Sequence, residues 1–166
     1  MKFSAPTFQT QIESPLGAML LAASEKGLRG AWFVQGQRHM PDRSDWIHAQ
    51  DNAFLMQAQE QLRNYFSGKA LSFSIPLDLG CGTRFQQTVW RALLKIPRGS
   101  TTSYGQLSAE IGKPKAVRAL GGAVGRNPLS IIVPCHRVIG ADGSLTGYAG
   151  GLERKVKLLQ LEGLSY

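Results

Sequence analysis

Ser130-Ile131-Ile132-Val133-Pro134-Cys135-His136-Arg137-Val138 places an apolar run directly before a thiol, an imidazole and a guanidinium. The apolar run favours a buried strand, although its periodicity alone does not exclude a helix. Pro134 lacks a backbone N–H and ends regular structure. A thiol held at the end of a buried element suits a nucleophile, because only the thiolate is strongly nucleophilic. The competing interpretation is a buried, inert cysteine, which is the commoner outcome for an isolated Cys-His dipeptide.

The composition predicts an ordinary globular protein. A chain of 166 residues, 43% hydrophobic and 18% charged, can form one medium domain or two small ones. We expect a cytoplasmic protein, because the sequence shows neither a leader pattern nor an apolar run long enough to span a membrane. Cys81 and Cys135 are far apart and have no metal-ligand spacing, so the sequence predicts neither a disulfide nor a metal site.

The positive charge is concentrated in the second half of the chain. Residues 1–80 contain seven Lys/Arg and seven Asp/Glu, whereas residues 81–166 contain twelve Lys/Arg and four Asp/Glu. The second half therefore carries the whole formal excess of +8. A basic half joined to a neutral half indicates contact with a polyanion, although a basic surface that serves only solubility is the alternative.

The first half of the chain is predicted to be a scaffold domain, residues 1–80. Residues 8–34 contain three short apolar segments separated by turns at 14–17 and 24–27, which predicts an antiparallel meander. Residues 35–50 are polar and are predicted to form a loop in which His39 and His48 are solvated. Asp51 is predicted to cap a helix that ends at Gly68, and alternating apolar residues over 71–77 predict one more strand.

The second half is predicted to be mainly helical and to begin after a linker at residues 79–82 that contains Cys81, which we interpret as non-catalytic. Thr83 and Gln86 form a capping-box pattern for a helix that ends before Pro97. Helices over 104–111 and from Lys115 to about Val124, joined by Gly112-Lys113-Pro114, form a helix-turn-helix pattern. The last helix, 152–161, is predicted to bury Leu152, Val156 and Leu159. The fold class is therefore α+β.

The second helix of this pair has an unusual run of small residues. Arg118 is followed by Ala119, Leu120, Gly121, Gly122 and Ala123. Each glycine inside a helix costs about 1 kcal/mol relative to alanine. A face of small residues allows either a partner or a neighbouring helix to approach closely, and composition does not distinguish these alternatives.

Several separated blocks of the sequence resemble the O6-alkylguanine-DNA alkyltransferases of the bacterial constitutive type. Residues 134–138 resemble the active-site signature of that family. Five further blocks occur in its order and spacing: Arg126-Asn127-Pro128, Tyr104-Gly105-Gln106-Leu107, residues 117–123, residues 148–152 and Leu161-Glu162-Gly163. The resemblance is strong from about Thr83 to Gly163 and only topological before that. It implies a ribonuclease H-like N-terminal domain and a winged-helix-like domain, residues 83–166, that binds DNA and transfers the alkyl group.

The resemblance also implies a reaction. An alkylated base must leave the duplex to be attacked, and Arg118 would replace it in the stack. Ala119, Gly121 and Gly122 would lie against the minor groove, where bulky side chains do not fit. The Cys135 thiolate would take the alkyl group from O6-alkylguanine, and from O4-alkylthymine as a second substrate, as a thioether. Because nothing releases a thioether, each molecule would act once.

The remaining site residues are assigned from the same resemblance. Adjacent side chains in an extended backbone point to opposite faces, so direct contact between Cys135 and His136 is not expected. Instead His136 would reach the thiol through a water and be oriented by Glu162. Asn127 would hold the turn, and Tyr104 would donate its hydroxyl to the guanine. The backbones of Cys135, Val138 and Ala149 would read the base edge, and Tyr148 belongs to the glycine-rich loop beside them. Arg137 is expected to form a structural salt bridge.

The expected partner is double-stranded DNA that contains O6-alkylguanine, bound by a monomer without a cofactor, a metal or a membrane. Ser130 and Ala149 occupy positions where some relatives have Pro and Ser, so the tolerated alkyl size is open. The N-terminal zinc ligands of some relatives are absent. Two alternatives remain: a lesion-binding protein without transfer, whose known examples lack the cysteine, and a Cys-His hydrolase, which only the dipeptide supports.

Overall fold

The computed structural model describes residues 6–166, and the chain divides into two compact units, residues 1–81 and 82–166. The first five residues, where the predicted scaffold domain begins, lie outside the described part. The first unit contains a four-stranded sheet and one helix, and the second is mainly helical. The predicted α+β class is confirmed.

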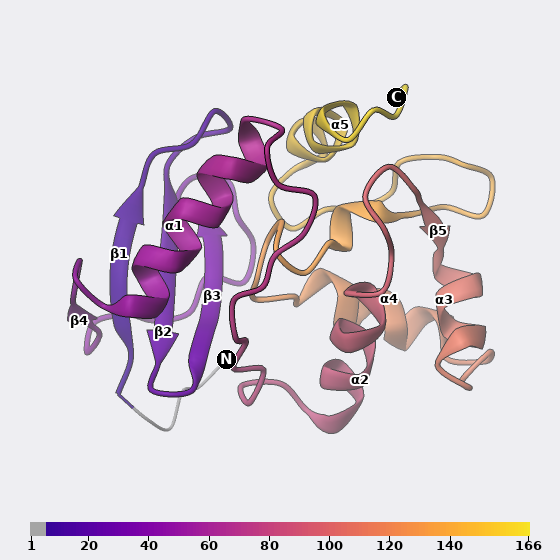
Figure 1. Ribbon diagram of the computed structural model, residues 1–166. Coiled ribbons are helices and arrows are strands. Elements are labelled where there is room, and N and C mark those ends of the chain that lie inside the picture. The colour runs from indigo at the N-terminus through magenta and orange to yellow at the C-terminus, as the bar shows by residue number, and fades with distance from the viewer. Residues whose placement is uncertain (1–5) are drawn as a thin grey trace. The chain divides into compact units, whose positions relative to one another are not determined.

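The sheet of the first unit has the order β3-β2-β1-β4. Strands β1 (Phe8–Ile12), β2 (Met19–Ser24) and β3 (Gly27–Phe33) form the predicted antiparallel meander (Figure 1). Every residue of β2 and β3 is buried. The prediction of a loop over residues 35–50 was wrong at one point, because β4 (Ile47–His48) lies in this segment and pairs in parallel with β1. A strand of two exposed residues has no periodicity from which it could be recognised.

Helix α1 (Ala53–Phe66) packs on the sheet and contacts β1, β2 and β3 (Figure 1). Its buried face consists of Leu55, Ala58, Leu62 and Tyr65. The predicted cap was one residue early: Asn52, not Asp51, accepts hydrogen bonds from the amides of Phe54 and Leu55. The helix ends as predicted before Gly68, which has a φ of 74° that favours glycine.

The strand predicted over residues 71–77 is absent. Leu71 is 72% exposed, and of this segment only Leu77 forms a bridge, to Leu28 of β3. Two backbone hydrogen bonds, from Leu28 N to Pro76 O and from Asp78 N to Leu28 O, attach the segment to β3. The alternation of apolar residues therefore reflects partial burial without a strand partner along its length.

The second unit begins with α2 (Arg84–Leu93), whose predicted capping box between Thr83 and Gln86 has both hydrogen bonds. Helix α3 (Tyr104–Glu110) starts with a second capping box, and α4 (Val117–Gly125) follows a tight turn. Helix α4 begins two residues later than the predicted Lys115. The indole N–H of Trp90 donates to the carbonyl of Ala123 at 2.9 Å and ties α2 to α4. The predicted helix-turn-helix arrangement is thus present.

The nine-residue stretch with the cysteine is buried, but its apolar part is not a strand. Residues 131–133 form turns, and Ile131 has a φ of 74°. A β-branched residue at positive φ is an outlier, and such strain is concentrated at functional sites. Cys135 then opens a 3-10 helix, η1 (Cys135–Arg137). The backbone here is therefore not extended, and the predicted alternation of the Cys135 and His136 side chains on opposite faces of an extended segment does not apply.

Two short strands bring the start of α3 beside this stretch. Strand β5 (Thr102–Ser103) pairs in parallel with β6 (Val138–Ile139), which directly follows η1. Tyr104, the first residue of α3, therefore lies one residue beyond this ladder. A parallel ladder of two residues leaves no sequence pattern, but here it helps to assemble the site.

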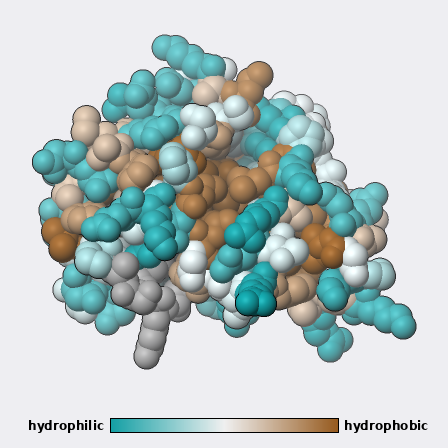
Figure 2. Space-filling view, turned by 60° about the horizontal axis from the view of Figure 1, so that its bottom comes forward, coloured by the Kyte–Doolittle hydropathy of each residue, from teal (hydrophilic) through white to brown (hydrophobic). Residues whose placement is uncertain are grey.

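The last helix, α5 (Leu152–Leu161), buries a different face from the predicted one. Leu152 is 47% exposed and Val156 is only half-buried, whereas Leu159 is buried as expected. The inward position between Leu152 and Leu159 is taken by a charged residue, Lys155, which is 0% exposed. Figure 2 shows that the surface bears apolar side chains interspersed among hydrophilic ones.

Candidate active site

Cys135 lies at the start of η1 and is only 5% exposed. The side-chain amide of Asn127 donates a hydrogen bond to its sulfur at 3.1 Å. Burial raises the pKa of the Cys135 thiol above its ordinary value, while the Asn127 bond and the charge of Lys155 act to lower it. The resting group is therefore a protonated thiol whose surroundings partly stabilise the thiolate. A nucleophilic reaction requires a base that removes the proton.

Asn127 fixes the turn that leads to the cysteine. Its Oδ1 accepts from the amide of Leu129 at 2.9 Å, and its Nδ2 donates to the carbonyl of Val133 at 2.8 Å as well as to the sulfur. Asn127 is buried. One buried amide thus links the two ends of the strained turn and also contacts the thiol.

His136 and Glu162 form a fully buried pair. Nε2 of His136 lies 2.8 Å from Oε1 of Glu162, and both side chains are 0% exposed. Arg137 donates to both oxygens of the same carboxylate, from Nε at 2.8 Å and from Nη2 at 2.9 Å. Its Nη1 also donates to the carbonyl of Ile96. Glu162 therefore receives a bidentate guanidinium and an imidazole, and Arg137 forms the predicted salt bridge.

The hydrogen bonds of His136 determine its tautomer. Burial lowers the pKa of His136, although Glu162 acts in the opposite direction, so the ring is neutral. Because the carboxylate only accepts, Nε2 carries the hydrogen and Nδ1 carries the lone pair. Nδ1 is buried and has no hydrogen-bond partner within residues 6–166. The site therefore holds a neutral imidazole with a free basic nitrogen on the residue next to the thiol.

Lys155 is a functional candidate that the sequence analysis missed. Its buried Nζ donates to the carbonyls of Val138 at 2.6 Å, Thr146 at 2.7 Å and Gly147 at 3.4 Å. Burial lowers the pKa of Lys155 to about 8, and the nearby Cys135 thiolate acts to raise it. Lys155 joins the segment after the cysteine to the glycine-rich loop. Its signal in the sequence was its place on the inward face of α5, between apolar residues.

Tyr104 stands half-buried at the beginning of α3. Burial raises the pKa of Tyr104, the nearby Thr146 side chain acts to lower it, and the nearby Cys135 thiolate acts to raise it. The Tyr104 hydroxyl therefore lies in the electrostatic neighbourhood of the thiol. Thr146 is a second residue that the sequence analysis did not single out.

The exposed face of α4 carries the residues predicted to contact DNA. Arg118 and Ala119 are exposed, and Gly121 and Gly122 are half-buried. A Cβ added at Gly121 would come no closer than 3.9 Å, to the Tyr104 ring, and one at Gly122 no closer than 3.5 Å, to Arg126 Nη1. Packing within the second unit therefore does not require glycine at either position. Of the two alternatives for the small residues, this finding favours the approach of a partner.

The backbone groups predicted to read the base differ in their exposure and in the hydrogen bonds that they already form. Tyr148 and Ala149 are buried in the glycine-rich loop, at 7% and 9% exposure. The carbonyl of Val138 already accepts a hydrogen bond from Lys155. Since a carbonyl oxygen has two lone pairs, one acceptor position remains there.

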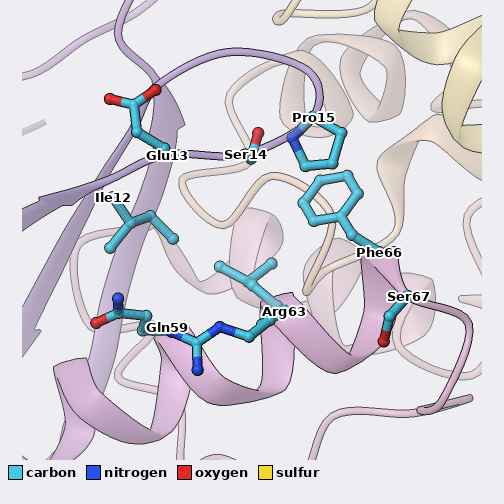
Figure 3. Close-up of a pocket in the computed structure, with 9 residues that line it drawn as sticks. Ile12, Glu13, Ser14, Pro15, Gln59, Arg63, Phe66 and Ser67 are labelled. Atoms are coloured by element: carbon cyan, nitrogen blue, oxygen red, sulfur yellow. The ribbon is translucent and has the colours of Figure 1, made fainter.

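The other candidate features lie away from this chemistry. Cys81 belongs to the first unit, and burial together with the charge of Asp78 raises its pKa to about 11. A hollow of about 300 Å³ in the same unit lies between the β1–β2 turn and α1 (Figure 3). None of its nine lining residues is a cysteine or a histidine. Residues 6–166 contain no cluster of three potential metal ligands and no helix long and apolar enough to cross a membrane.

Comparisons with known proteins cover both units. Residues 8–79 match the family model described as "6-O-methylguanine DNA methyltransferase, ribonuclease-like domain", and residues 84–164 match that of the "DNA binding domain" of the same family. A methylated-DNA–protein-cysteine methyltransferase of Methanosarcina barkeri is 51% identical over 91% of this chain and 94% of its own length. The protein of that name from Mycobacterium leprae is 50% identical over 91% of this chain and 89% of its own length.

A solved structure agrees with these relatives. The crystal structure of Mycobacterium tuberculosis OGT in complex with DNA superposes with a TM-score of 0.87 at 47% identity, covering 94% of this chain and 93% of the other. Two family models that together span most of the chain, and relatives near 50% identity, lead to one conclusion. The chain belongs to the 6-O-methylguanine DNA methyltransferase family.

Proposed function

We propose that this protein is a methylated-DNA–protein-cysteine methyltransferase that moves the alkyl group of O6-alkylguanine in DNA to Sγ of Cys135. The observation that carries the proposal is a buried thiol, hydrogen-bonded to Asn127, next to a His136–Glu162 pair in which the basic Nδ1 of His136 has no hydrogen-bond partner among the described residues 6–166. The curated relatives carry the name of this activity. The Mycobacterium tuberculosis relative was solved in complex with DNA.

The site residues supply the proton transfers that the reaction needs. His136, held by Glu162, takes the thiol proton through an intervening water, as in other base-and-orienter pairs. The sulfur forms a bond to the alkyl carbon while the carbon–oxygen bond breaks, and its electrons pass to the guanine. The Tyr104 hydroxyl gives a proton to the departing guanine, so the purine leaves neutral. The product is a thioether, which water does not cleave, so each molecule reacts once.

Binding to DNA is proposed to involve the basic half of the chain. Residues 81–166 hold the whole positive excess, and the open small-residue face of α4 allows a duplex to approach its backbone. The alkylated base is extruded, and the exposed Arg118 takes its place in the stack. Val138, Tyr148 and Ala149 then form the base pocket.

Several finer assignments belong to the same proposal. We assign residues 1–80 to a scaffold domain and residues 83–166 to the DNA-binding and alkyl-transfer domain, acting as a monomer without a cofactor. O4-alkylthymine is a second substrate, because it presents the same alkyl–oxygen bond. A reducing compartment such as the cytoplasm suits the protein, because oxidation of Cys135 would consume its nucleophile.

The test is peptide mass spectrometry after mixing the protein with duplex DNA that contains one O6-methylguanine. We expect one added CH2 group on the peptide with Cys135 and none on the peptide with Cys81, whose raised pKa makes it the internal control. Product should level off at one methyl group per protein molecule. Binding without an adduct would support the lesion-binding alternative, and product beyond that stoichiometry would support a hydrolase.

A further inference from the structure

Arg137 holds the carboxylate that orients His136 at two points. Its Nε donates to Oε2 of Glu162 at 2.8 Å and its Nη2 donates to Oε1 at 2.9 Å, so the two planar groups pair side by side. The third nitrogen, Nη1, donates to the carbonyl of Ile96, and the residue is only 7% exposed. The guanidinium is therefore anchored through all three of its nitrogens.

One oxygen of Glu162 serves both of its neighbours. Oε1 accepts from Nη2 of Arg137 and also lies 2.8 Å from Nε2 of His136. A carboxylate that faced the imidazole alone would favour the imidazolium, because opposite charges attract strongly in a buried site. Here the guanidinium already compensates that carboxylate, so its attraction for a second positive charge is reduced.

The charges around His136 distinguish a proton from solvent from the proton of the thiol. Burial, Arg137 and Lys155 lower the pKa of His136, and Glu162 acts to raise it. A proton taken from solvent would add a positive charge to a fully buried ring that already faces two cations and one anion. A proton taken from Cys135 leaves the total charge unchanged, because the thiolate forms together with the imidazolium.

We propose, on the basis of the alkyl-transfer function above, that Arg137 is a positioning residue whose charge compensates Glu162 and so keeps His136 neutral until it receives the proton of Cys135. Glu162 orients the ring, and Arg137 removes the attraction that would otherwise bring a solvent proton to Nδ1. During transfer the thiol proton moves to Nδ1 through water, and the sulfur forms its bond to the alkyl carbon. The imidazolium then returns this proton, through water, to the Tyr104 oxygen that protonated the guanine, so His136 ends neutral.

The first test is the pH dependence of the single-turnover rate at saturating O6-methylguanine duplex. Arg137→Gln keeps a hydrogen-bond donor but removes the charge, so its rate should fall on the acid side at a pH about one unit or more above that of wild type. Arg137→Lys keeps the charge but loses the planar fork, so its plateau rate should be lower while its acid limb stays close to that of wild type. Arg98→Gln is the control for a nearby positive charge, since Nη2 of Arg98 donates to the carbonyl of Leu161. Its acid limb should coincide with that of wild type.

The second test observes the imidazole directly, without DNA or alkyl transfer. The ring signals of His136 are assigned by comparison with His136→Gln and followed by NMR as the pH is lowered. The exposed His39 and His48 are internal references that should titrate alike in every variant. We expect the His136 ring to be protonated at a higher pH in Arg137→Gln than in wild type or Arg137→Lys.

A neutral pair keeps the test valid if Arg137→Gln alone does not fold, because loss of one partner of a buried ion pair is strongly destabilising. Glu162→Gln is then compared with the double variant Glu162→Gln/Arg137→Gln, in which two amides replace the ion pair. The His136 ring should be protonated at a higher pH in the double variant, since only there is the guanidinium charge absent.

The outcomes separate this inference from the proposed function. If wild type acquires no methyl group from the duplex, the proposed function fails, and the NMR titration still decides whether Arg137 keeps His136 neutral. If the His136 titration does not move when the Arg137 charge is removed, the role of Arg137 is wrong. Equal shifts in Arg137→Gln and Arg137→Lys would also overturn it, because the shape of the guanidinium rather than its charge would then control the protonation of His136.

Discussion

Nε2 of His136 and Oε1 of Glu162 lie 2.8 Å apart, and neither side chain is accessible to solvent. Glu162 directly follows α5, whereas His136 lies in η1, so the pair joins two segments that are 26 residues apart in the sequence. Because Arg137 also binds this carboxylate, the pair does not leave an uncompensated buried charge. The geometry orients the ring so that Nδ1 is the basic atom next to the thiol segment.

Replacing Glu162 by Gln should slow alkyl transfer at least about tenfold, in the range found for partners that orient catalytic histidines. The amide carries no charge to hold the Nε2 hydrogen, and it pairs poorly with Arg137, so the free energy of unfolding should also fall. Duplex affinity should remain close to that of wild type. Single-turnover kinetics and urea unfolding measure the two effects, with Glu153→Gln on the exposed face of α5 as the matched control. A Glu162→Gln protein that reacts at the wild-type rate would contradict the assigned role.

Replacing Cys135 by Ala should abolish transfer while leaving the binding of alkylated duplex intact. The contacts to DNA are assigned to α4 and to basic side chains, and the thiol acts only after the base has entered its pocket. Fluorescence anisotropy with a labelled O6-methylguanine duplex measures the affinity, and Cys81→Ala should both bind and transfer like wild type. Loss of binding in a folded Cys135→Ala protein would contradict this separation of recognition from chemistry.

The protein should lose stability in mild acid because of His136. Burial lowers the folded-state pKa of this histidine below its ordinary value of 6.5, so the unfolded chain binds a proton more readily than the folded one. Stability is therefore lost as the pH falls from about 6.5 toward the folded pKa, at a rate of at most about 1.4 kcal/mol per pH unit for one proton.

Urea unfolding of wild type, His136→Gln and the exposed-site control His48→Gln at pH 7.0 and 5.5 tests this expectation. Wild type and the control should lose more stability between the two pH values than His136→Gln. Equal losses in all three proteins would show that His136 is not the group whose protonation destabilises the fold.

Replacing Gly122 by Ala should stabilise the fold and weaken DNA binding at the same time. The added methyl group meets only Arg126 Nη1, at 3.5 Å, and an alanine in a helix is favoured over glycine by about 1 kcal/mol. The same methyl group stands on the face that is proposed to meet the minor groove. Gly105→Ala in α3 is the matched control, because Gly105 is exposed and outside that face. It should stabilise without changing duplex affinity, and a Gly122→Ala protein that binds DNA like wild type would argue for a different DNA-contacting surface.

Replacing Arg118 by Ala should slow the repair of O6-methylguanine in duplex DNA more than the reaction with the free modified base. Only the duplex needs a side chain that fills the stack after extrusion, which costs a few kcal/mol. The ratio of the two rates, measured in parallel, is the readout, and Arg84→Ala at the start of α2 serves as a charge-matched control. Equal slowing of both reactions would place the defect in the site itself.

The sequence by itself determined most of the helices, and it was sufficient to name the residues that are assigned to the site around Cys135. Capping boxes at Thr83 and Ser103 are local, because the side chain and the amide that it binds are three residues apart. The meander was likewise predictable from turns and apolar segments. The blocks around Cys135, Tyr104 and Glu162 pointed to the family before any contact was known.

Only the tertiary structure decided the features that depend on partners distant in the chain. Strand β4 and the β5–β6 ladder are two residues each, and they exist because another segment offers free backbone groups. The turns over residues 131–133 replace a predicted strand because the Asn127 amide binds both of their ends. The place of Lys155 between apolar positions of α5 was a weak signal of burial against the usual exposure of lysine, and its contacts were not predictable, since the three carbonyls that hold it come from other segments. Local sequence specifies local hydrogen bonds, whereas burial of a charge is decided by what the rest of the fold places around it.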